Sequence, residues 1–362
     1  MIGSKIYSII RSPLPCYKII LVLVFRALLL ILYGLGKLFD GLFYSKANKV
    51  RIKNPVFLIG HPRSGTTFIH RFLIDFQADF RGMLLWEMIL PYISLRKLLK
   101  KRIEYFNMAG RKNLYNPDIH KTGLKEAETD DVALFFKSFE GLFFWLYFRA
   151  FNHFKNAEEL ELDLIQNIQV KKSLLYLKKV HSRNLLQSNN FDNRAFSKSF
   201  SLIMDIEEIF QIFPDSKIIL LIRNPMEVIP SSISLISGLM DKLYAFKKMD
   251  PDLQKRFYEN IYQASVLFYK SLDKVLTNNI EFKDKMILIN YPEIKNNFSA
   301  TMFKLIDFLS INKTVDMMEK ISSQEITQKA YSSRHSYHLS DFGFDEERIK
   351  KDFDFIYQKY KI

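Results

Sequence analysis

Residues 55–74 contain the pattern with the clearest chemical potential. The apolar run from Val56 to Gly60 is short enough for a buried strand of a parallel sheet, and residues 68–74 have apolar side chains at helical spacing. Residues 62–67, Pro-Arg-Ser-Gly-Thr-Thr, form the loop between them. At the start of a helix, unpaired backbone N–H groups and the helix dipole favour an anion. The pattern therefore predicts that this loop binds a phosphate.

The loop differs from one that binds a nucleoside triphosphate. Gly60 and Gly65 have the spacing of a nucleotide phosphate loop, but Thr66 stands where such a loop has the lysine that reaches the β- and γ-phosphates. The cation is instead Arg63, inside the loop, and we expect it to lie beside a group attached to the phosphate. A loop that matches by chance is the alternative, because phosphate-loop motifs also occur without that function.

A second predicted strand ends in another candidate phosphate ligand. Residues 217–223, Lys-Ile-Ile-Leu-Leu-Ile-Arg, form an apolar run after a Phe-Pro-Asp turn, and Ser231 follows Arg223 by eight residues. A guanidinium offers several donors to a phosphate, and a hydroxyl adds a neutral donor. Taken alone, Arg223 is better explained by a surface ion pair with Glu227 or Asp215.

The two motifs together resemble the sulfotransferase superfamily, in particular its bacterial-type branch. In that family, Pro-Arg/Lys-Ser-Gly-Thr-Thr binds the 5′-phosphosulfate, and an arginine at a strand end with a serine eight residues later holds the 3′-phosphate. The strand-like run 286–290 before Tyr291 and the terminal segment 334–343 also resemble parts of the family. Residues 198–202 depart from it, because the Pro and His of a Lys-Ser-Pro-x-His pattern are missing. The resemblance implies that the donor is bound by Arg63, Ser64, Gly65, Thr66, Thr67, Arg223, Ser231, Tyr291 and Arg334.

The resemblance also implies the reaction, which moves a sulfonyl group from 3′-phosphoadenosine-5′-phosphosulfate to a hydroxyl or an amine. Such a transfer needs a base for the acceptor and a cation near the leaving 5′-phosphate oxygen. We expect Arg63 to be the cation and Glu87 the base, since relatives place a catalytic glutamate at nearly this spacing. An ordinary exposed carboxylate is the alternative for Glu87, and His120 and His61 are the next candidate bases. A solvated helix start is expected for the acidic run, which contains Glu126, Glu128, Asp130 and Asp131.

Two other functions remain open at this point. A P-loop kinase acting on a small molecule would need the triphosphate lysine and Mg²⁺ ligands, and Thr66 argues against it. A membrane-anchored nucleotide-binding protein without catalysis would be expected to have lost at least one of the candidate ligands. We expect no metal requirement, because a sulfonyl group carries less charge than a phosphoryl group and cationic side chains can stabilise the transition state.

The composition fits an α/β domain. With 362 residues, of which 48% are hydrophobic and 15% aromatic, the chain can bury a sizeable core. We predict a P-loop-type parallel sheet flanked by helices over residues 50–362. The net charge of +14 suits a polyanionic nucleotide, whereas scattered lysines and the lack of a recognised motif argue against nucleic acid. The single cysteine, Cys16, excludes an intrachain disulfide and disfavours an oxidising compartment.

Residues 1–49 are predicted to form a membrane-associating segment. The run from 19 to 43 is apolar over about the length of a membrane span, but Arg26 would make a span costly by roughly 2.5–3.5 kcal/mol. We favour a helix in the membrane interface, with Arg26 extended to the headgroups and the flanking basic residues facing anionic lipid. A single span and a helix packed on the enzyme are the alternatives. The catalytic domain is expected on the cytoplasmic face, where the donor is made.

The region between the two motifs, residues 94–193, is predicted to be a mainly helical insertion. It includes an aromatic tract at residues 132–136 and 141–148. In one explanation these rings form a helical core. In the other they line an acceptor pocket, because ligand pockets are rich in apolar and aromatic side chains. The aromatic tract and the apolar segment favour a lipid, a lipid-linked glycan or a hydrophobic small molecule as acceptor.

Overall fold

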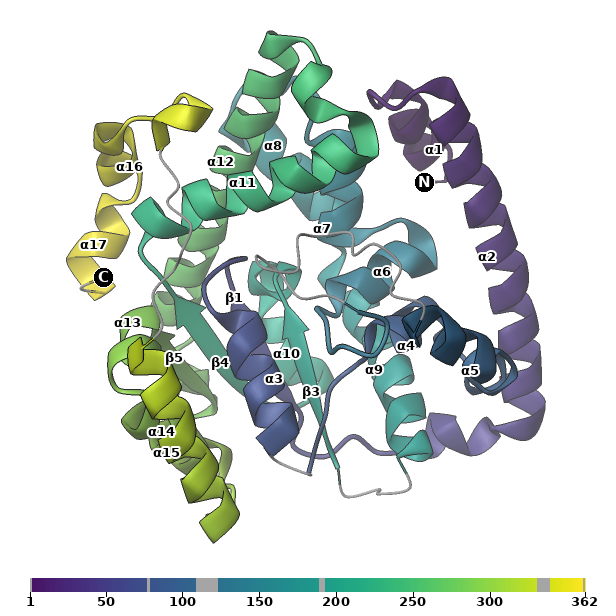
Figure 1. The fold of residues 1–362 in the computed structure, drawn as a ribbon, viewed down its shortest axis with the longest axis vertical. Helices are drawn as coiled ribbons and strands as arrows, with labels where there is room; N and C mark the ends of the chain where they lie inside the picture. The colour runs from purple at the N-terminus through teal and green to yellow at the C-terminus, as the bar shows by residue number, and fades with distance from the viewer. Residues whose placement is uncertain (1, 77–78, 109–122, 189–192, 331–338, 361) are drawn as a thin grey trace.

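A parallel sheet lies at the centre of the computed structural model, which describes all residues except 1, 77–78, 109–122, 189–192, 331–338 and 361 (Figure 1). Each neighbouring pair of strands is parallel. The predicted α/β fold is therefore confirmed, as are its strands at 56–60, 217–222 and 286–290. In spatial order the strands of this sheet are β2 (Phe80–Arg81), β3 (Arg194–Ser199), β1 (Val56–Gly60), β4 (Lys217–Ile222) and β5 (Met286–Asn290).

Strand β3 lies between β2 and β1, although the sequence does not predict it. Its residues, Arg-Ala-Phe-Ser-Lys-Ser, lack the apolar run that marks β1 and β4. The polar side chains are buried with partners from a distant segment: Ser197 donates to Asp130 Oδ2 (2.6 Å) and Ser199 to the Asp131 carboxylate. Since buried polar groups need such partners, tertiary contacts rather than a local pattern stabilise this strand.

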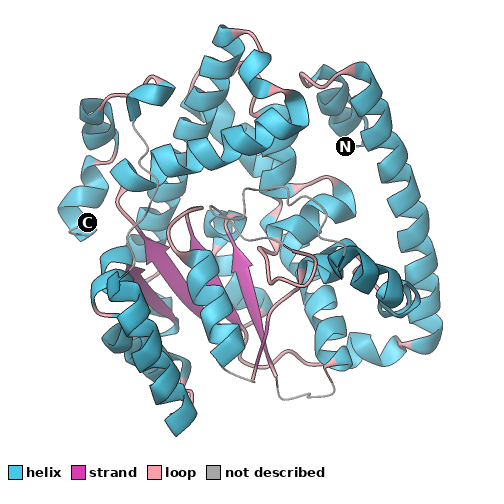
Figure 2. Cartoon of the chain, viewed as in Figure 1, coloured by secondary structure: helices cyan, strands magenta, loops and turns pink. Residues whose placement is uncertain are grey.

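Helices cover both faces of the sheet (Figure 2). Along β1, Val56 and Leu58 face one core while Phe57 and Ile59 face the other, as the alternation of a strand requires. The first core is completed by α3 (Thr66–Phe76), α13 (Tyr291–Asn296), α14 (Phe298–Leu309) and α15 (Val315–Ala330). The second is completed by α9 (Val170–Gln187), α10 (Glu207–Ile212), α11 (Pro225–Tyr244), α12 (Pro251–Asn278), α16 (Glu346–Asp352) and α17 (Asp354–Tyr360).

The described part of the segment between β2 and β3 is mainly helical, as the sequence predicts. Side chains of its aromatic tract divide between the two explanations that the sequence left open. Trp145 and Phe144 are fully buried in the core, whereas Phe136 and Phe143 line a cavity. Besides α9, the described helices of this insertion are α4 (Leu85–Ile89), α5 (Ile93–Met108), α6 (Asp131–Ser138), α7 (Gly141–Phe144), the π-helix η2 (Trp145–Arg149) and α8 (Ala157–Asn167).

The N-terminal helices, α1 (Ile2–Arg11) and α2 (Cys16–Phe43), pack on this insertion, and α2 runs along one edge of the molecule (Figure 1). Near the end of α2, the Asp40 carboxylate accepts hydrogen bonds from the backbone N–H groups of Ile93 and Ser94, both at 2.9 Å. These two groups belong to the first turn of α5, so α2 caps that helix. One face of α2 is therefore part of the fold.

Arg26 also turns toward the protein. Its guanidinium donates to the carbonyls of Phe136 (2.7 Å) and Lys137, in the last turn of α6, where the helix dipole favours a cation. The expectation that Arg26 extends to lipid headgroups is wrong for this reason. Among the described residues, α2 is the one helix long and apolar enough to cross a membrane, and 17% of its most apolar window is buried. The exposed side chains on its other face include Ile20, Leu21, Val24, Leu28, Ile31, Leu35, Leu38 and Leu42.

Candidate active site

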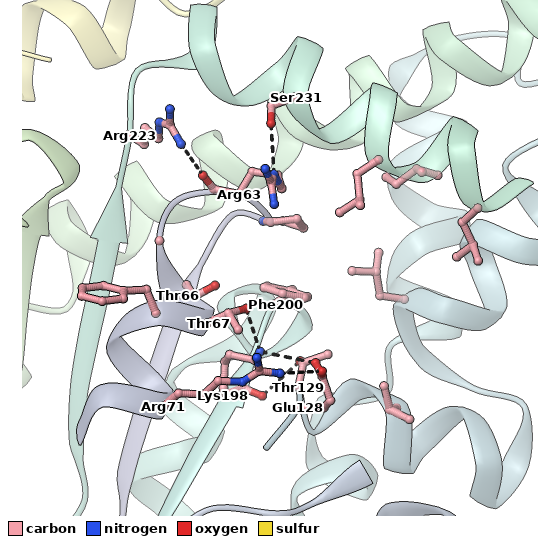
Figure 3. Close-up of a pocket in the computed structure, with 18 of the residues that line it drawn as sticks. Arg63, Thr66, Thr67, Arg71, Glu128, Thr129, Lys198, Phe200, Arg223 and Ser231 are labelled. Atoms are coloured by element: carbon pink, nitrogen blue, oxygen red, sulfur yellow. Dashed lines mark hydrogen bonds and ion pairs between the residues drawn. The ribbon is translucent and has the colours of Figure 1, made fainter. Parts of the chain in front are cut away.

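The predicted phosphate loop joins β1 to α3 in a conformation that only some residues adopt easily. Gly65 has φ +91°, and a Cβ there would come within 3.1 Å of the Tyr291 ring. Both the backbone angle and the close ring therefore require glycine. Arg63 also has a positive φ, +73°, which turns its side chain along the rim of a cavity (Figure 3). Thr66 and Thr67 begin α3 and line the same cavity.

Ser64 and His61 stabilise the loop from its buried side. The Ser64 hydroxyl and backbone N–H both donate to the His61 carbonyl, at 2.7 and 3.1 Å, and Ser64 is fully buried. Its hydroxyl thus points away from the cavity that Ser64 is predicted to serve. The His61 ring is bonded to Ser265 Oγ (3.1 Å), and burial lowers its pKa to about 4. His61 does not line the cavity, so its position does not support a role as the base.

The two predicted phosphate ligands meet at the loop, although they are far apart in the sequence. Arg63 Nε donates to Ser231 Oγ at 3.0 Å, and Arg223 Nη1 donates to the Arg63 carbonyl at 2.9 Å (Figure 3). The Arg223 guanidinium also lies over the Tyr291 ring, 4.1 Å from its centroid, and pairs with Glu227 (2.7 Å). Arg223 therefore forms the expected ion pair with Glu227 and also lines the cavity, where it is available to a phosphate.

A buried group of charged residues forms another part of the cavity wall. Lys198, at the end of β3, donates to Thr67 Oγ1 (3.1 Å), and its Nζ lies 3.9 Å from Glu128 Oε2. Arg71 Nη2, from α3, donates to Glu128 Oε1 at 2.8 Å. Burial lowers the pKa of Lys198 to about 8 and raises the pKa of Glu128. A carboxylate with a raised pKa that faces a cavity is suited to accept a proton.

Glu87 lies elsewhere. Its side chain is 3% exposed, and it does not line the cavity. One carboxylate oxygen pairs with Arg81, and the other accepts from the backbone N–H of Leu84 (3.0 Å) at the start of α4. The position therefore fits neither the predicted base nor the alternative of an exposed carboxylate. It fits a residue that stabilises a helix start and a buried ion pair.

The acidic run is mostly buried, which corrects the expectation of a solvated helix start. Asp130 Oδ2 accepts from Ser197 (2.6 Å) and lies 2.9 Å from His181 Nε2. Asp131 accepts from the backbone N–H of Phe200 at 2.8 Å. These bonds attach the start of α6 to the end of β3, and the same attachment brings Glu128 to Lys198. The run is thus the link between the insertion and the sheet.

The cavity between these groups has a volume of about 1230 Å³. The phosphate loop, the start of α3, Lys198 of β3 and Arg223, directly after β4, supply its polar wall, to which Tyr291, Lys295 and Gln328 also contribute. The opposite wall is apolar and comes from helices. Its residues in the insertion include Val132, Phe135, Phe136, Leu142, Phe143 and Tyr147, and α11 adds Leu235, Ile236, Leu239 and Leu243.

The sequence analysis missed Lys198, Glu128 and Arg71 as site residues. Identifying residues 194–199 as a strand would have found Lys198, because ligands of parallel sheets bind at the carboxyl ends of strands. Nothing in the local sequence separates Glu128 from the other acidic residues of its run. Arg334 and His120, which the sequence also proposes, lie outside the described residues. Within the described part of the chain, no group of three or more His, Cys, Asp or Glu side chains is placed to hold a metal ion.

Comparison with known proteins gives one family. Residues 55–315 match the model described as “Sulfotransferase family”, a segment that includes both strand-end motifs and more than half of the chain. None of the curated proteins compared with this chain matches it.

Two solved structures have a similar fold. The sulfotransferase STF1 from Mycobacterium tuberculosis H37Rv superposes with a TM-score of 0.69 at 15% identity, over 95% of this chain and 87% of that one. STF9 from Mycobacterium avium gives 0.68 at 16% identity, over 90% and 81%. At these identities the likeness shows the fold alone, and the family match carries the assignment. The chain therefore belongs to the sulfotransferase family, and it is a transferase enzyme.

Proposed function

We propose that the protein transfers a sulfonyl group from 3′-phosphoadenosine-5′-phosphosulfate to a hydroxyl or amine acceptor. The observation that carries this proposal is the meeting of Arg63, Arg223 and Ser231 at one end of the cavity. Helix α3 begins at the same point, so its N-terminal N–H groups suit the 5′-phosphosulfate. Arg223 and Ser231 suit a second, separate phosphate at the 3′ position.

The charges at this end fit a donor with two anionic groups. Glu227 occupies two nitrogens of Arg223, but its side chain is 55% exposed. An ion pair this open contributes only about 0–1 kcal/mol, so a phosphate can replace the carboxylate at little cost. The Tyr291 ring lies next to Gly65 and under the Arg223 guanidinium, so it offers the nucleotide an apolar edge beside both proposed phosphate positions.

We assign the role of general base to Glu128 rather than to Glu87. In the proposed reaction, the acceptor O–H proton passes to the Glu128 carboxylate while the acceptor oxygen bonds to the sulfonyl sulfur. The bond from sulfur to the 5′-phosphate oxygen breaks, and that oxygen keeps the electron pair. The products are a sulfate ester and 3′-phosphoadenosine-5′-phosphate. Arg63 neutralises charge on the leaving phosphate, and protonated Lys198 neutralises charge on the sulfonyl oxygens.

The kinase alternative has less support. Thr66 stands where a triphosphate-binding loop has lysine, and Lys198 approaches the loop from β3 beside a carboxylate instead. The inactive alternative also has less support, because Arg63, Thr67, Arg223, Ser231, Glu128 and Lys198 all line the same cavity.

The test is transfer of label from donor labelled with radioactive sulfur, using a lipid and glycan extract of the source cells as acceptor. The wild-type protein should produce a labelled product and an equal amount of 3′-phosphoadenosine-5′-phosphate, and Glu128→Gln should not. A labelled product from γ-labelled ATP, with none from the sulfur-labelled donor, would replace this proposal with the kinase alternative.

We also propose that the protein binds an anionic membrane surface through α2, with residues 50–362 on the cytoplasmic face. The exposed apolar face of α2 and its flanking lysines and arginines support binding to an anionic surface. Flotation with phosphatidylglycerol vesicles should carry the full chain upward, whereas vesicles of phosphatidylcholine alone should carry less. External protease should leave the domain uncut in intact cells and cut it after lysis. Cleavage in intact cells would place the domain outside.

A further inference from the structure

We infer that the acceptor is a membrane-resident amphiphile, with a hydroxyl head at Glu128 and a long apolar tail in the apolar part of the cavity. This inference rests on the proposed sulfonyl transfer and names its acceptor class. It is carried by the continuity of three features: a charged reaction centre, an apolar wall and the exposed apolar face of α2.

The cavity has room for a second ligand beside the nucleotide. Its volume, about 1230 Å³, exceeds the range of about 300–1,000 Å³ that is usual for a pocket holding one small molecule. The groups assigned to the donor all lie on the polar wall. The remaining space is bounded mainly by aliphatic and aromatic side chains, which come from α3, α4, α6, α7, η2 and α11. A sugar acceptor would leave its hydroxyl groups unpaired against that wall, which is costly.

The wall changes from polar to apolar in an ordered way along the chain. Glu128 and Thr129, just before α6, line the cavity next to Lys198, and Val132, Phe135 and Phe136 of α6 line it farther along the chain. Steps of three to four residues place the side chains of Val132, Phe135 and Phe136 on one face of α6. A hydroxyl at Glu128 is therefore continuous with a tail that extends along α6 toward its C-terminal end.

That end of α6 is also where α2 is attached. Phe136 makes an edge-to-face contact with Phe25 (centroids 6.4 Å apart), and its carbonyl accepts from Arg26. On the other side of the cavity, Lys18 donates to the carbonyl of Leu243, another lining residue. Residues of the apolar wall thus contact α2 directly, and the far face of α2 exposes apolar side chains.

A protein that rests on a membrane through this face holds the apolar end of its cavity one helix, α2, away from the lipid layer. An acceptor with a long tail is already concentrated in that layer, and its tail loses no contact with apolar surroundings when it enters the cavity. Water-soluble acceptors gain neither advantage.

The first experiment measures kcat/KM for a series of primary alcohols from butanol to hexadecanol, with glucose as the polar comparison. Burial of each added methylene should raise kcat/KM about fourfold until the apolar part is filled. Values independent of length, or a higher value for glucose, would overturn the inference. Stabilisation by 3′-phosphoadenosine-5′-phosphate is measured in parallel, and its absence would indicate failure of the proposed donor instead.

Variants of the apolar wall sharpen this test. Leu235→Gln places an amide on the lining of the cavity and should reduce the dependence of kcat/KM on chain length. Leu162→Gln is the matched control, because Leu162 is 59% exposed on α8 and does not line the cavity. An unaltered melting shift with the product nucleotide shows that Leu235→Gln is folded. An unaltered length dependence in that folded variant would contradict the assignment of the tail.

Delivery from the membrane has its own measurement. The double variant Leu21→Gln, Leu28→Gln changes two exposed positions of α2, at 61% and 55% exposure, without touching the cavity lining. Its rate on hexadecanol in phosphatidylglycerol vesicles should fall at least several-fold more than its rate on the same alcohol in detergent micelles. Equal losses in both would overturn delivery from the membrane.

Discussion

The two walls of the cavity are built in different ways. We call the polar wall, which is proposed to bind the donor, the donor wall, and the apolar wall, which is proposed to bind the acceptor, the acceptor wall. The donor wall comes from the carboxyl ends of neighbouring strands. Short sequence motifs place Arg63 and Arg223 there, and Arg223 donates a hydrogen bond to the Arg63 carbonyl. The acceptor wall comes from helices of the insertion and α11, and no short motif marks it. In the proposed reaction, nucleotide binding therefore depends on a few polar groups at the strand ends, whereas acceptor choice depends on the packing of many apolar side chains.

The difference also predicts which residues can be replaced without loss of activity. Some residues of the donor wall have positive φ angles that few other residue types adopt. Replacing one of them therefore changes the geometry of the proposed anion site. Replacing one apolar side chain of the acceptor wall changes the volume of the pocket by a small amount. We expect substitutions on the donor wall to remove activity and substitutions on the acceptor wall to change specificity.

The largest effect is expected at the junction of the two walls. Glu128→Gln should lower turnover about 10²–10⁴-fold, since the amide cannot accept the acceptor proton. Donor affinity, measured by calorimetry with the product nucleotide, should change little. Glu126→Gln is the matched control, because Glu126 also pairs with Arg71 (3.7 Å) but does not line the cavity. Full turnover in Glu128→Gln would remove this residue as the base.

The donor wall should respond in binding rather than in chemistry. Arg223→Ala should weaken binding of 3′-phosphoadenosine-5′-phosphate by about 1.5–3 kcal/mol, the range for a hydrogen bond to a charged group. The control is Arg348→Ala, because Arg348 has the same pair of partners, a glutamate (Glu259, 2.6 Å) and a tyrosine ring (Tyr262, 4.4 Å). Equal losses of affinity in the two variants would show that the effect is not specific to the site.

Glu87 separates the structural from the catalytic role of a buried carboxylate. Glu87→Gln should lower the free energy of unfolding by about 1–3 kcal/mol, because Arg81 and the start of α4 lose a charged partner. Urea unfolding measures this change. Glu161→Gln is the control, because Glu161 is exposed. A variant of normal stability whose turnover falls 10²-fold or more would restore Glu87 as the base.

The smallest effect is a displacement of the pH profile. Burial lowers the pKa of Lys198 to about 8, so kcat/KM should fall as the pH rises through that value and Lys198 loses its charge. On the acid side, burial raises the pKa of Glu128, so the base is protonated at a higher pH than an ordinary glutamate. Lys198→Arg should move the alkaline limb upward, because arginine stays protonated. An unmoved limb would assign it to another group.

The sequence predicts the donor wall well because its information is local. An apolar run, a loop with a positive-φ glycine and a helix start are each recognisable from neighbouring residues, and the structure places β1, the loop and α3 as expected. The same holds for β4 and Arg223. These motifs do not predict the direction of each side chain. The inward direction of the Ser64 hydroxyl is therefore seen only in the structure.

The charged group at Glu128 and Lys198 depends on contacts over long sequence distances. A buried strand with the sequence Arg-Ala-Phe-Ser-Lys-Ser is stable only because Asp130 and Asp131 supply its partners. Neither segment indicates this pairing by itself. The position of Arg26 is a similar case, since its carbonyl partners belong to the end of α6.

The most direct test of the central claim compares thermal stabilisation by two nucleotides. The native state should be stabilised by 3′-phosphoadenosine-5′-phosphate at 100 times its Kd by about 2.7 kcal/mol, because a ligand that binds only the folded state shifts the equilibrium by mass action. We predict a clear rise in Tm with this nucleotide, a smaller rise in Arg223→Ala at the same nucleotide concentration, and a much smaller rise with ATP and Mg²⁺ than with 3′-phosphoadenosine-5′-phosphate in the wild-type protein. A larger rise with ATP and Mg²⁺ would contradict the account.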